Sequence, residues 1–391
     1  MNGNNKIVHF LSASDRINYG DLLFPILFEK FAETENFHIK FYNYGVVKSN
    51  LSHYGALPTQ SYLKLLKNVK SKGGKLVVGG GEVFFANWRV LYSFINPMYV
   101  KLCSNNYFKR MDDTINLPKY ILSRNKVNVP FCPSKEELSN TSVKIYFSSV
   151  GGEFNDSKES DLNKKLFISL KTSALLSVRD KRTLLSMRLM GLDAKLIPDS
   201  AIIMSDVFKK ESLFGKISLI NFKVKDYIFL QLGRFKGPEN LKQFVEDLKK
   251  LSNSLNLKVV LCPIGKALKH EDDILLKKVK EMESDFHYIN PKNIYDVMFL
   301  IANASLYLGT SLHGVITAQS FNVPFVGLNT RLKKVESYIQ TWVDDSMVCL
   351  PFGEVGRIES IYGNWDFKTI NSKTAIQKEV VKENLRFILN D

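Results

Sequence analysis

The chain has 391 residues, of which 45% are hydrophobic and 24% charged, a composition that is ordinary for a globular protein and excludes collagen-like, coiled-coil and largely disordered classes. Its 54 Lys and Arg residues outnumber 39 Asp and Glu residues, so the formal charge is +15 and we expect acidic partners. Four scattered cysteines without a CxxC pair, and an N-terminus without an apolar signal region, favour a reducing, cytoplasmic location.

The first half of the chain alternates short apolar runs with helical stretches, which is typical of a parallel sheet with crossover helices. This pattern predicts a Rossmann-like domain over residues 1–205, followed by a linker at 204–225. The expected strands cover 7–11, 39–44, 76–78, 145–150 and 175–178, and the expected helices cover 22–31, 62–69 and 181–190.

The second half repeats the alternation and predicts another Rossmann-like domain over residues 220–345. A C-terminal segment, 346–391, ends in a helix at 373–389 that we expect to pack back on the first domain. The fold class is therefore α/β, with two Rossmann-like domains facing across a cleft, because ligands of open parallel sheets bind beyond the carboxyl ends of the strands. The expected strands cover 227–232, 259–263, 306–309 and 325–327, and the expected helices cover 239–251, 272–282, 294–302 and 312–321.

The loop after the expected strand 306–309 is the strongest candidate for chemistry. It reads Gly309-Thr310-Ser311-Leu312-His313-Gly314, so small residues end a strand and a histidine lies in the first turn of a helix. The N–H groups and dipole of such a helix start attract anions. His313 could serve as a general acid there; the alternative is a purely structural hydrogen bond.

Two other strand ends carry charged residues. Arg179 follows the strand 175–178 and could bind a carboxylate in bidentate fashion, or it could form an ion pair with Asp180 or Asp199 that holds the turn. Arg234 follows the strand 227–232, and Lys333 follows the strand 325–327. These two cations could surround an acidic ligand, although each alone is typical of a protein surface.

Glycines follow the first and third strands. Asn18, Gly20 and Asp21 come after the first, and Gly79-Gly80-Gly81 with Glu82 comes after the third. Glycine allows a ligand or another backbone to approach closely; close helix packing, and a capping role for Asp21, are the alternatives. Neither segment matches a nucleotide-binding fingerprint, and no metal-binding motif occurs in the sequence.

The order and spacing of these motifs resemble those of the polysaccharide pyruvyl transferases, over roughly residues 7 to 345. The resemblance implies a glycosyltransferase-B-like fold, phosphoenolpyruvate as co-substrate with no further cofactor, and a sugar diol of a lipid-diphosphate-linked polysaccharide precursor as acceptor. The product would be a cyclic pyruvate ketal. Many members carry Arg two residues before the histidine, where this chain has Ser311, so an anion contact must come from Arg179, Arg234 or Lys333.

The resemblance also implies roles for the candidate residues. His313 would be the acid or leaving-group stabiliser, Arg179 would bind the donor carboxylate, and Asp21, Glu82 or Asp199 would be the base. The remaining donor contacts would come from Thr310, Ser311, Leu312, Gly314, Arg234 and Lys333. The acceptor contacts would come from Asn18, Gly20, Gly80 and Gly81.

Two other functions compete with this interpretation. A nucleotide-sugar-dependent glycosyltransferase would have the same architecture and would also hold a donor phosphate with cations. A non-enzymatic binding protein is suggested by the stretch 36–111, where eleven Lys or Arg residues are opposed only by Glu82 and are interleaved with aromatics. No nucleic-acid module accompanies this stretch, so we expect no nucleic-acid partner. Two interpretations of the stretch remain: it binds the anionic inner face of the cytoplasmic membrane, or its lysines are simply exposed to solvent.

Overall fold

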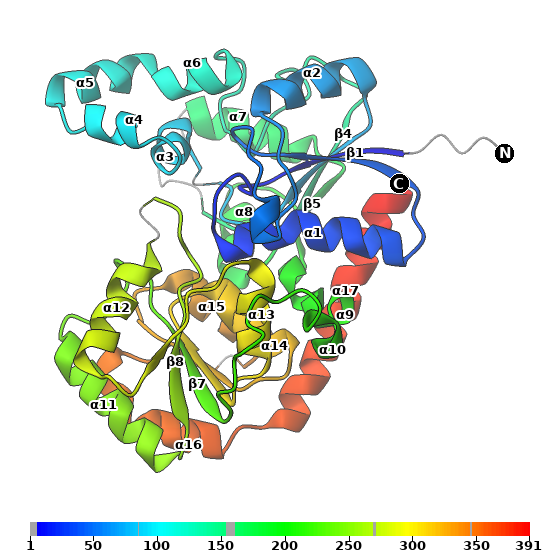
Figure 1. The fold of residues 1–391 in the computed structure, drawn as a ribbon. Helices are drawn as coiled ribbons and strands as arrows, with labels where there is room; N and C mark the ends of the chain where they lie inside the picture. Colours follow the sequence, from blue (N-terminus) through cyan, green and yellow to red (C-terminus); the bar gives the residue numbers. More distant parts are fainter. Residues whose placement is uncertain (1–5, 85, 154–160, 269–270, 345) are drawn as a thin grey trace. The chain divides into compact units, whose positions relative to one another are not determined.

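The computed structural model describes residues 6–84, 86–153, 161–268, 271–344 and 346–391, which divide into two compact units (Figure 1). Unit 1 consists of Met1–Ile17, Asp21–Ser200 and Glu383–Asp391. Unit 2 consists of Asn18–Gly20 and Ala201–Lys382. Each unit contains one parallel sheet with helices packed on it, so the predicted α/β class with two Rossmann-like units is confirmed.

The sheet of unit 1 has the strand order β2-β1-β3-β4-β5-β6 and is parallel throughout. Its central strands are apolar over nearly their whole length, because helices cover both faces of a doubly wound sheet. The order reverses between β1 and β3, and such a switch point is where ligands of these sheets bind. The strands are β1 (Lys6–Leu11), β2 (Ile39–Tyr44), β3 (Lys75–Gly79), β4 (Lys144–Val150), β5 (Leu175–Val178) and β6 (Lys195–Leu196).

Four helices between β3 and β4 form an arm that the sequence analysis did not predict (Figure 1, cyan). An asparagine caps each of them, since the side chains of Asn87, Asn96, Asn105 and Asn116 accept hydrogen bonds from N–H groups of the following turn. These caps divide the segment into helices of six to ten residues. The arm consists of α3 (Trp88–Ser93), α4 (Pro97–Leu102), α5 (Asn106–Ile115) and α6 (Leu117–Ser123).

The other helices of unit 1 connect its strands, and the three that were predicted are confirmed. An additional helix, α7, follows β4. They are α1 (Tyr19–Thr34), whose first two residues group with unit 2, α2 (Tyr62–Lys72), α7 (Asp161–Lys171) and α8 (Lys181–Leu189), and a 3-10 turn, η1 (Ser52–Tyr54), precedes α2.

The sheet of unit 2 is also parallel, with the order β11-β10-β7-β8-β9 and a switch point between β7 and β10. The four strands predicted here are confirmed, and the short β9 at the edge is new. The strands are β7 (Tyr227–Gln231), β8 (Lys258–Leu261), β9 (His287–Tyr288), β10 (Leu306–Gly309) and β11 (Phe325–Gly327).

The segment expected as a linker is folded over its first part, so that prediction was wrong for residues 204–213. Two short helices form there, and their apolar residues Met204 and Leu213 are completely buried. The helical elements of unit 2 are η2 (Ser200–Ile203), α9 (Met204–Val207), α10 (Lys210–Leu213), α11 (Leu241–Ser254), α12 (Asp272–Met282), α13 (Ile294–Ala302), α14 (Leu312–Ser320), α15 (Lys333–Trp342), η3 (Phe352–Glu354) and α16 (Arg357–Gly363).

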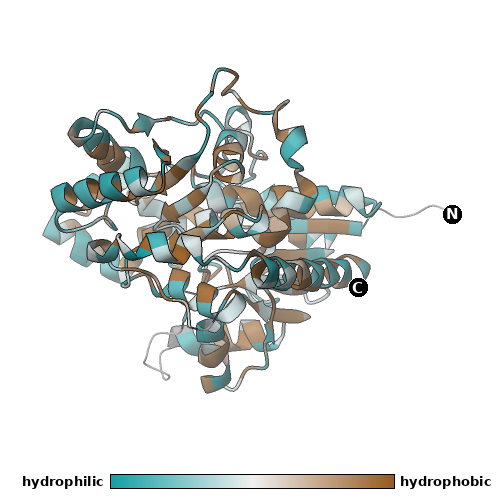
Figure 2. Ribbon diagram, turned by 90° about the horizontal axis from the view of Figure 1, so that it is seen from below, coloured by the Kyte–Doolittle hydropathy of each residue, from teal (hydrophilic) through white to brown (hydrophobic). Residues whose placement is uncertain are grey.

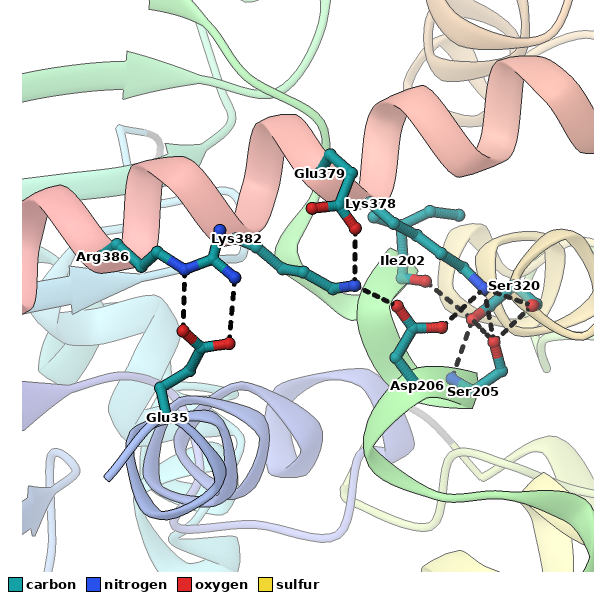
Figure 3. A network of polar contacts seen from close by, with 9 residues as sticks. All are labelled: Glu35, Ile202, Ser205, Asp206, Ser320, Lys378, Glu379, Lys382 and Arg386. Carbon is teal, nitrogen blue, oxygen red and sulfur yellow. Dashed lines mark hydrogen bonds and ion pairs between the residues drawn. The ribbon is translucent and has the colours of Figure 1, made fainter. Parts of the chain in front are cut away.

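The last helix, α17 (Phe367–Asn390), begins six residues before the expected start and contributes to both units. Hydrophilic and hydrophobic residues alternate along it, as in an amphipathic helix (Figure 2). Within unit 2, Lys378 and Lys382 contact Asp206 at 3.2 and 2.6 Å. Within unit 1, Arg386 forms a bidentate pair with Glu35 at 2.8 and 2.9 Å (Figure 3).

Candidate active site

In unit 2, hydrogen bonds join the loops that follow β7 and β10 at the switch point. Thr310 is fully buried, and its hydroxyl accepts a hydrogen bond from the N–H of Gly233 at 2.9 Å. The N–H of Thr310 donates to Oε1 of Gln231 at 3.1 Å. Thr310 therefore holds two strand ends together, a role that differs from the predicted direct contact with a donor.

The start of α14 lies tightly against its own sheet. Ser311 is the N-cap of this helix, and its hydroxyl accepts from the N–H of Gly314 at 3.4 Å. A side chain at Gly314 would collide with Tyr307, because a Cβ atom there would lie 1.9 Å from the tyrosine hydroxyl. Leu312 is buried as well. Helix packing thus accounts for Leu312 and Gly314, while the N–H groups of the first turn remain at the switch point.

The half-buried His313 lies directly against the backbone of Gly20. A Cβ atom on Gly20 would lie 1.8 Å from Nδ1 of the imidazole, so only glycine fits at this position. Tyr19 anchors the contact: it is buried, its N–H donates to the carbonyl of Ile264 at 3.2 Å, and its hydroxyl lies 3.1 Å from Oγ1 of Thr317 on α14. Two motifs that are almost 300 residues apart in the printed sequence are thereby brought together within unit 2.

A buried carboxyl group that the sequence analysis missed lies beside this switch point. Oδ2 of Asp272 accepts hydrogen bonds from Nε2 of Gln231 at 2.8 Å and from the N–H groups of Ile264 and Gly265 at 3.2 and 3.0 Å. Burial raises the pKa of Asp272 to about 6, although these hydrogen bonds act in the opposite direction. The sequence signal was only a run of three acids at a helix start, and nothing in it showed that the middle one is buried.

The two cations predicted for the donor side are exposed and make surface ion pairs. The guanidinium of Arg234 contacts Glu271 at 3.0 Å and lies over the ring of Phe235, 4.9 Å from its centre. Lys333 contacts Glu336 at 3.3 Å. Exposed pairs of this kind contribute about 0 to 1 kcal/mol, so an incoming anion can replace either carboxylate at little cost.

In unit 1, the switch point between β1 and β3 brings Asp21 and the triple glycine together. A Cβ atom on Gly81 would lie 3.9 Å from Oδ1 of Asp21. Gly80 and Gly81 have φ angles of 65° and 76°, which glycine adopts without strain. A Cβ atom on Gly80 would also lie 2.1 Å from the ring of Phe24, so packing alone requires glycine there. Asp21 lies in the first turn of α1.

Arg179 is the centre of a buried ion network. Its side chain is 1% exposed and contacts Asp199 at 3.1 Å, Glu82 at 3.5 Å and Asp180 at 3.9 Å. Burial lowers the pKa of the guanidinium and the three carboxylates raise it, and the net result is a pKa above the ordinary value. A direct contact with a donor carboxylate would require one of these partners to be displaced. The geometry therefore favours the alternative reading, in which Arg179 positions its neighbours.

Glu82 also contacts Arg182, a second residue that the sequence analysis missed. The guanidinium of Arg182 lies 2.9 Å from Glu82 and 3.0 Å from Glu153, and all three side chains are partly accessible. Arg182 is in the first turn of α8, directly after the Val-Arg-Asp motif, and that position was the available signal. Glu82, unlike Asp199, thus lies where the buried network meets solvent.

Over the described ranges, no group of three or more His, Cys, Asp or Glu side chains is arranged to hold a metal ion. None of the described helices combines the length and apolar character that crossing a membrane requires.

The similarity to solved structures extends over almost the whole chain. UDP-N-acetylglucosamine 2-epimerase from Rickettsia bellii is 11% identical with a TM-score of 0.56, and 99% of this chain and 96% of that one are covered. The UDP-GlcNAc 2-epimerase of Methanocaldococcus jannaschii, solved with UDP-GlcNAc and UDP, is 12% identical with a TM-score of 0.52 and coverages of 97% and 99%. A glycosyltransferase from Rickettsia africae is 11% identical with a TM-score of 0.52 and coverages of 99% and 96%.

These similarities define the class of the protein, which has a glycosyltransferase-B-like fold. Because the sequence identities are low, the similarities show the fold alone. No curated protein sequence matches the chain. The family model described as Polysaccharide pyruvyl transferase matches residues 18–331. Because this match covers most of the chain, the protein belongs to the polysaccharide pyruvyl transferase family.

Proposed function

We propose that the protein transfers the pyruvyl group of phosphoenolpyruvate to two hydroxyls of one sugar in a lipid-diphosphate-linked precursor of a surface polysaccharide. The contact of His313 with Gly20 carries this proposal. It ties the histidine at an anion-attracting helix start to the glycine motif after β1, and both belong to the segment that matches the family.

The reaction needs one acid, one base and a set of cations. Protonation of the methylene carbon of phosphoenolpyruvate makes the adjacent carbon electrophilic, and the first sugar hydroxyl attacks that carbon. The bond from this carbon to the phosphate oxygen then breaks, and the second hydroxyl closes the ring. The two hydroxyl protons are accounted for by the new methyl group and the released phosphate, so the products are a cyclic pyruvate ketal and inorganic phosphate.

We assign the acid role to His313. Its imidazole is fixed on one side by Gly20, and its backbone carbonyl accepts a hydrogen bond from the Thr317 hydroxyl at 2.6 Å. The contact with Gly20 limits the orientations of the ring, and orientation is what makes a general acid effective.

We assign the anion contacts to accessible groups of unit 2. The first N–H groups of α14, at Leu312 and His313, point toward the switch point and suit the phosphate. Arg234 and Lys333 are the candidates for the carboxylate, since their present partners are surface glutamates. Ser311 replaces the arginine that many relatives carry, and it contributes the helix cap in place of a charge.

The base toward the acceptor comes, in this proposal, from unit 1. Asp21 lies beside Gly81, where the absence of side chains leaves room for a sugar, and Glu82 lies at the accessible edge of the ion network. Asp199 is fully buried against Arg179 and is therefore a positioning residue. Asn18 and Gly20 of unit 2, and Gly80 and Gly81 of unit 1, stay predicted acceptor contacts.

A histidine substitution tests the acid role. We expect His313→Gln to lower phosphate release from phosphoenolpyruvate and acceptor by about a hundredfold to ten-thousandfold, which is the usual contribution of a general acid. His287→Gln is the matched control, because His287 is on the edge strand β9, away from the switch point. Melting temperatures of both variants should stay within a few degrees of the wild type. Full activity of His313→Gln would overturn the assignment.

Donor identity separates the proposal from a nucleotide-sugar-dependent glycosyltransferase. We expect phosphoenolpyruvate, and not uridine or guanosine diphosphate, to raise the melting temperature of the wild-type protein. Incubation with phosphoenolpyruvate and a panel of lipid-diphosphate-linked sugars, followed by mass spectrometry, should show the mass gain of a pyruvate ketal on one of them. Stabilisation by a nucleoside diphosphate alone would favour the glycosyltransferase instead.

A further inference from the structure

The helix α5 in the arm of unit 1 exposes its apolar side. Tyr107, Met111 and Ile115 recur every four residues and therefore form one stripe along the helix. They are 84%, 45% and 58% exposed, whereas the residue that α5 buries is Asp112. This arrangement is the reverse of an ordinary surface helix, whose apolar stripe faces the core.

Polar contacts fix this reversed orientation. Asp112 is 2% exposed and accepts hydrogen bonds from the hydroxyl of Tyr99 at 2.6 Å and from the N–H of Leu117 at 2.8 Å. Arg89 on α3 adds an ion pair with Asp112 at 3.4 Å. Because the carboxylate is held from three directions, α5 cannot roll its apolar stripe inward without breaking a buried set of charged hydrogen bonds.

The other helices of the arm add exposed apolar side chains. Eight of the twenty large apolar residues that are exposed over the described ranges lie between residues 88 and 123, so a small part of the chain carries a large share of them. Concentrations of this kind mark interaction surfaces. Besides the stripe on α5, they are Val90, Met98, Leu102, Tyr120 and Ile121.

The arm is also strongly basic. Five cations in the arm or within three residues of its end are exposed and form no ion pair with any other residue that the structure describes. The two acidic residues between positions 86 and 126, Asp112 and Asp113, are both engaged by Arg89. A second copy of this face would repel the first, whereas an anionic surface would attract it. The five cations are Lys101, Lys109, Arg110, Arg124 and Lys126.

We propose that the arm docks on the surface of an anionic lipid bilayer. Tyr107, Met111 and Ile115 enter the boundary between headgroups and acyl chains, and the exposed cations contact lipid phosphates. An amphipathic helix with an outward apolar stripe and flanking cations is the arrangement that binds in the plane of such an interface. This surface is independent of the proposed activity, because vesicle binding requires neither donor nor acceptor.

Helix α2 provides a control with four exposed lysines and no exposed large apolar side chain. Lys64, Lys67, Lys70 and Lys72 are exposed on it, but its apolar residues, among them Leu65 and Val69, are buried in the core of unit 1. If charge alone determined membrane binding, removing these four lysines would weaken binding as much as changing the arm. If the apolar stripe is required, removing the lysines weakens binding less.

Vesicle flotation with the full chain tests the proposal. We expect the wild type to bind phosphatidylcholine vesicles that contain phosphatidylglycerol and to bind pure phosphatidylcholine weakly. Replacing Tyr107, Met111 and Ile115 together by Ser should weaken binding to the anionic vesicles on the order of a hundredfold, from the lost burial of three apolar side chains. The variant with Lys64, Lys67, Lys70 and Lys72 changed to Gln should keep most of the binding. Circular dichroism and melting temperatures establish that both variants are folded.

Three results would overturn the proposal. The wild type would fail to bind anionic vesicles, the serine variant would bind them as tightly as the wild type, or light scattering would show a wild-type oligomer that the serine variant abolishes in the absence of lipid. The last result would assign the stripe to contacts between copies of the chain. Changing Lys101, Lys109 and Arg110 to Gln should reduce the preference for anionic over neutral vesicles, and an unchanged preference would count against the role of charge.

Discussion

In each unit, the loops at the carboxyl edge of the sheet are joined to one another, but the contacts that join them differ between the two units. In unit 1, the loops after β3 and β5 are joined by ion pairs, with Arg179 between Asp199 and Glu82. In unit 2, neutral hydrogen bonds join the loops after β7 and β10, through Thr310 and Gln231. The charged edge has more carboxylates than guanidinium groups and therefore disfavours an anion, whereas the neutral edge presents the N–H groups of a helix start and the imidazole of His313. The same fold thus supports a structural ion network in one unit and a candidate anion site in the other.

Removal of Arg179 should have the largest effect on stability. The variant Arg179→Leu would leave Asp199 and Asp180 buried beside an apolar side chain, and loss of one partner from a buried ion pair destabilises by about 3 to 5 kcal/mol. Chemical denaturation should show this loss in the free energy of unfolding.

The partly exposed neighbour of Arg179 provides the matched control. Arg182→Gln removes contacts with Glu82 and Glu153, which water can replace, so a loss below about 1 kcal/mol is expected. Equal losses for the two arginines would show that the buried network is no more important to unit 1 than a surface pair.

The neutral edge of unit 2 should respond to pH through Asp272. The pKa of this carboxyl is about 6 in the folded chain, against an ordinary value of 3.8, so the folded state binds the proton more tightly than the unfolded state does. The stability that the bound proton adds is present below about pH 4 and is lost as the pH rises to about 6. Asp272→Asn has no such titration. Relative to the wild type, the variant should therefore gain up to about 3 kcal/mol between pH 4 and pH 7.

Urea unfolding of both proteins over this pH range measures the difference directly, because the other titrating groups are common to the two chains. Two curves that remain parallel would mean that Asp272 is ionised in the folded state and that its hydrogen bonds outweigh its burial.

The fold was largely predictable because its periodic segments are buried. Strands such as β3 and β10 are apolar over nearly every position, and residues such as Gly79 and Gly309 mark their ends. The arm from α3 to α6 was missed for the opposite reason. Its helices are short and their boundaries depend on asparagine caps, so a periodic spacing such as that of Tyr107, Met111 and Ile115 extends over too few turns to distinguish a helix from an irregular basic stretch.

The candidate site was predictable in its motifs but not in its contacts. The sequence indicated Arg179, Asp199 and Glu82 separately, and only the structure shows that they form one network. The burial of Asp272 at the start of α12 carried no signal, because Asp272 is held by Gln231 at the end of β7. Pairings between segments far apart in sequence are set by tertiary packing, which local patterns do not contain.

The approach of Gly20 to His313 gives the most selective prediction. In Gly20→Ala, the new methyl group would occupy the position 1.8 Å from Nδ1, so the imidazole must turn away from its present orientation. A displacement of about 1 Å in a catalytic group can lower the rate by about a hundredfold. Gly353→Ala is the control, since nothing lies within 4 Å of a Cβ atom there. We expect the first variant to lose turnover and to keep its affinity for phosphoenolpyruvate, because the helix N–H groups are untouched, while the second behaves like the wild type. If both variants had the same turnover, the contact between Gly20 and His313 would be needed only for packing in unit 2. The result would then contradict the assignment of the reaction to the neutral edge.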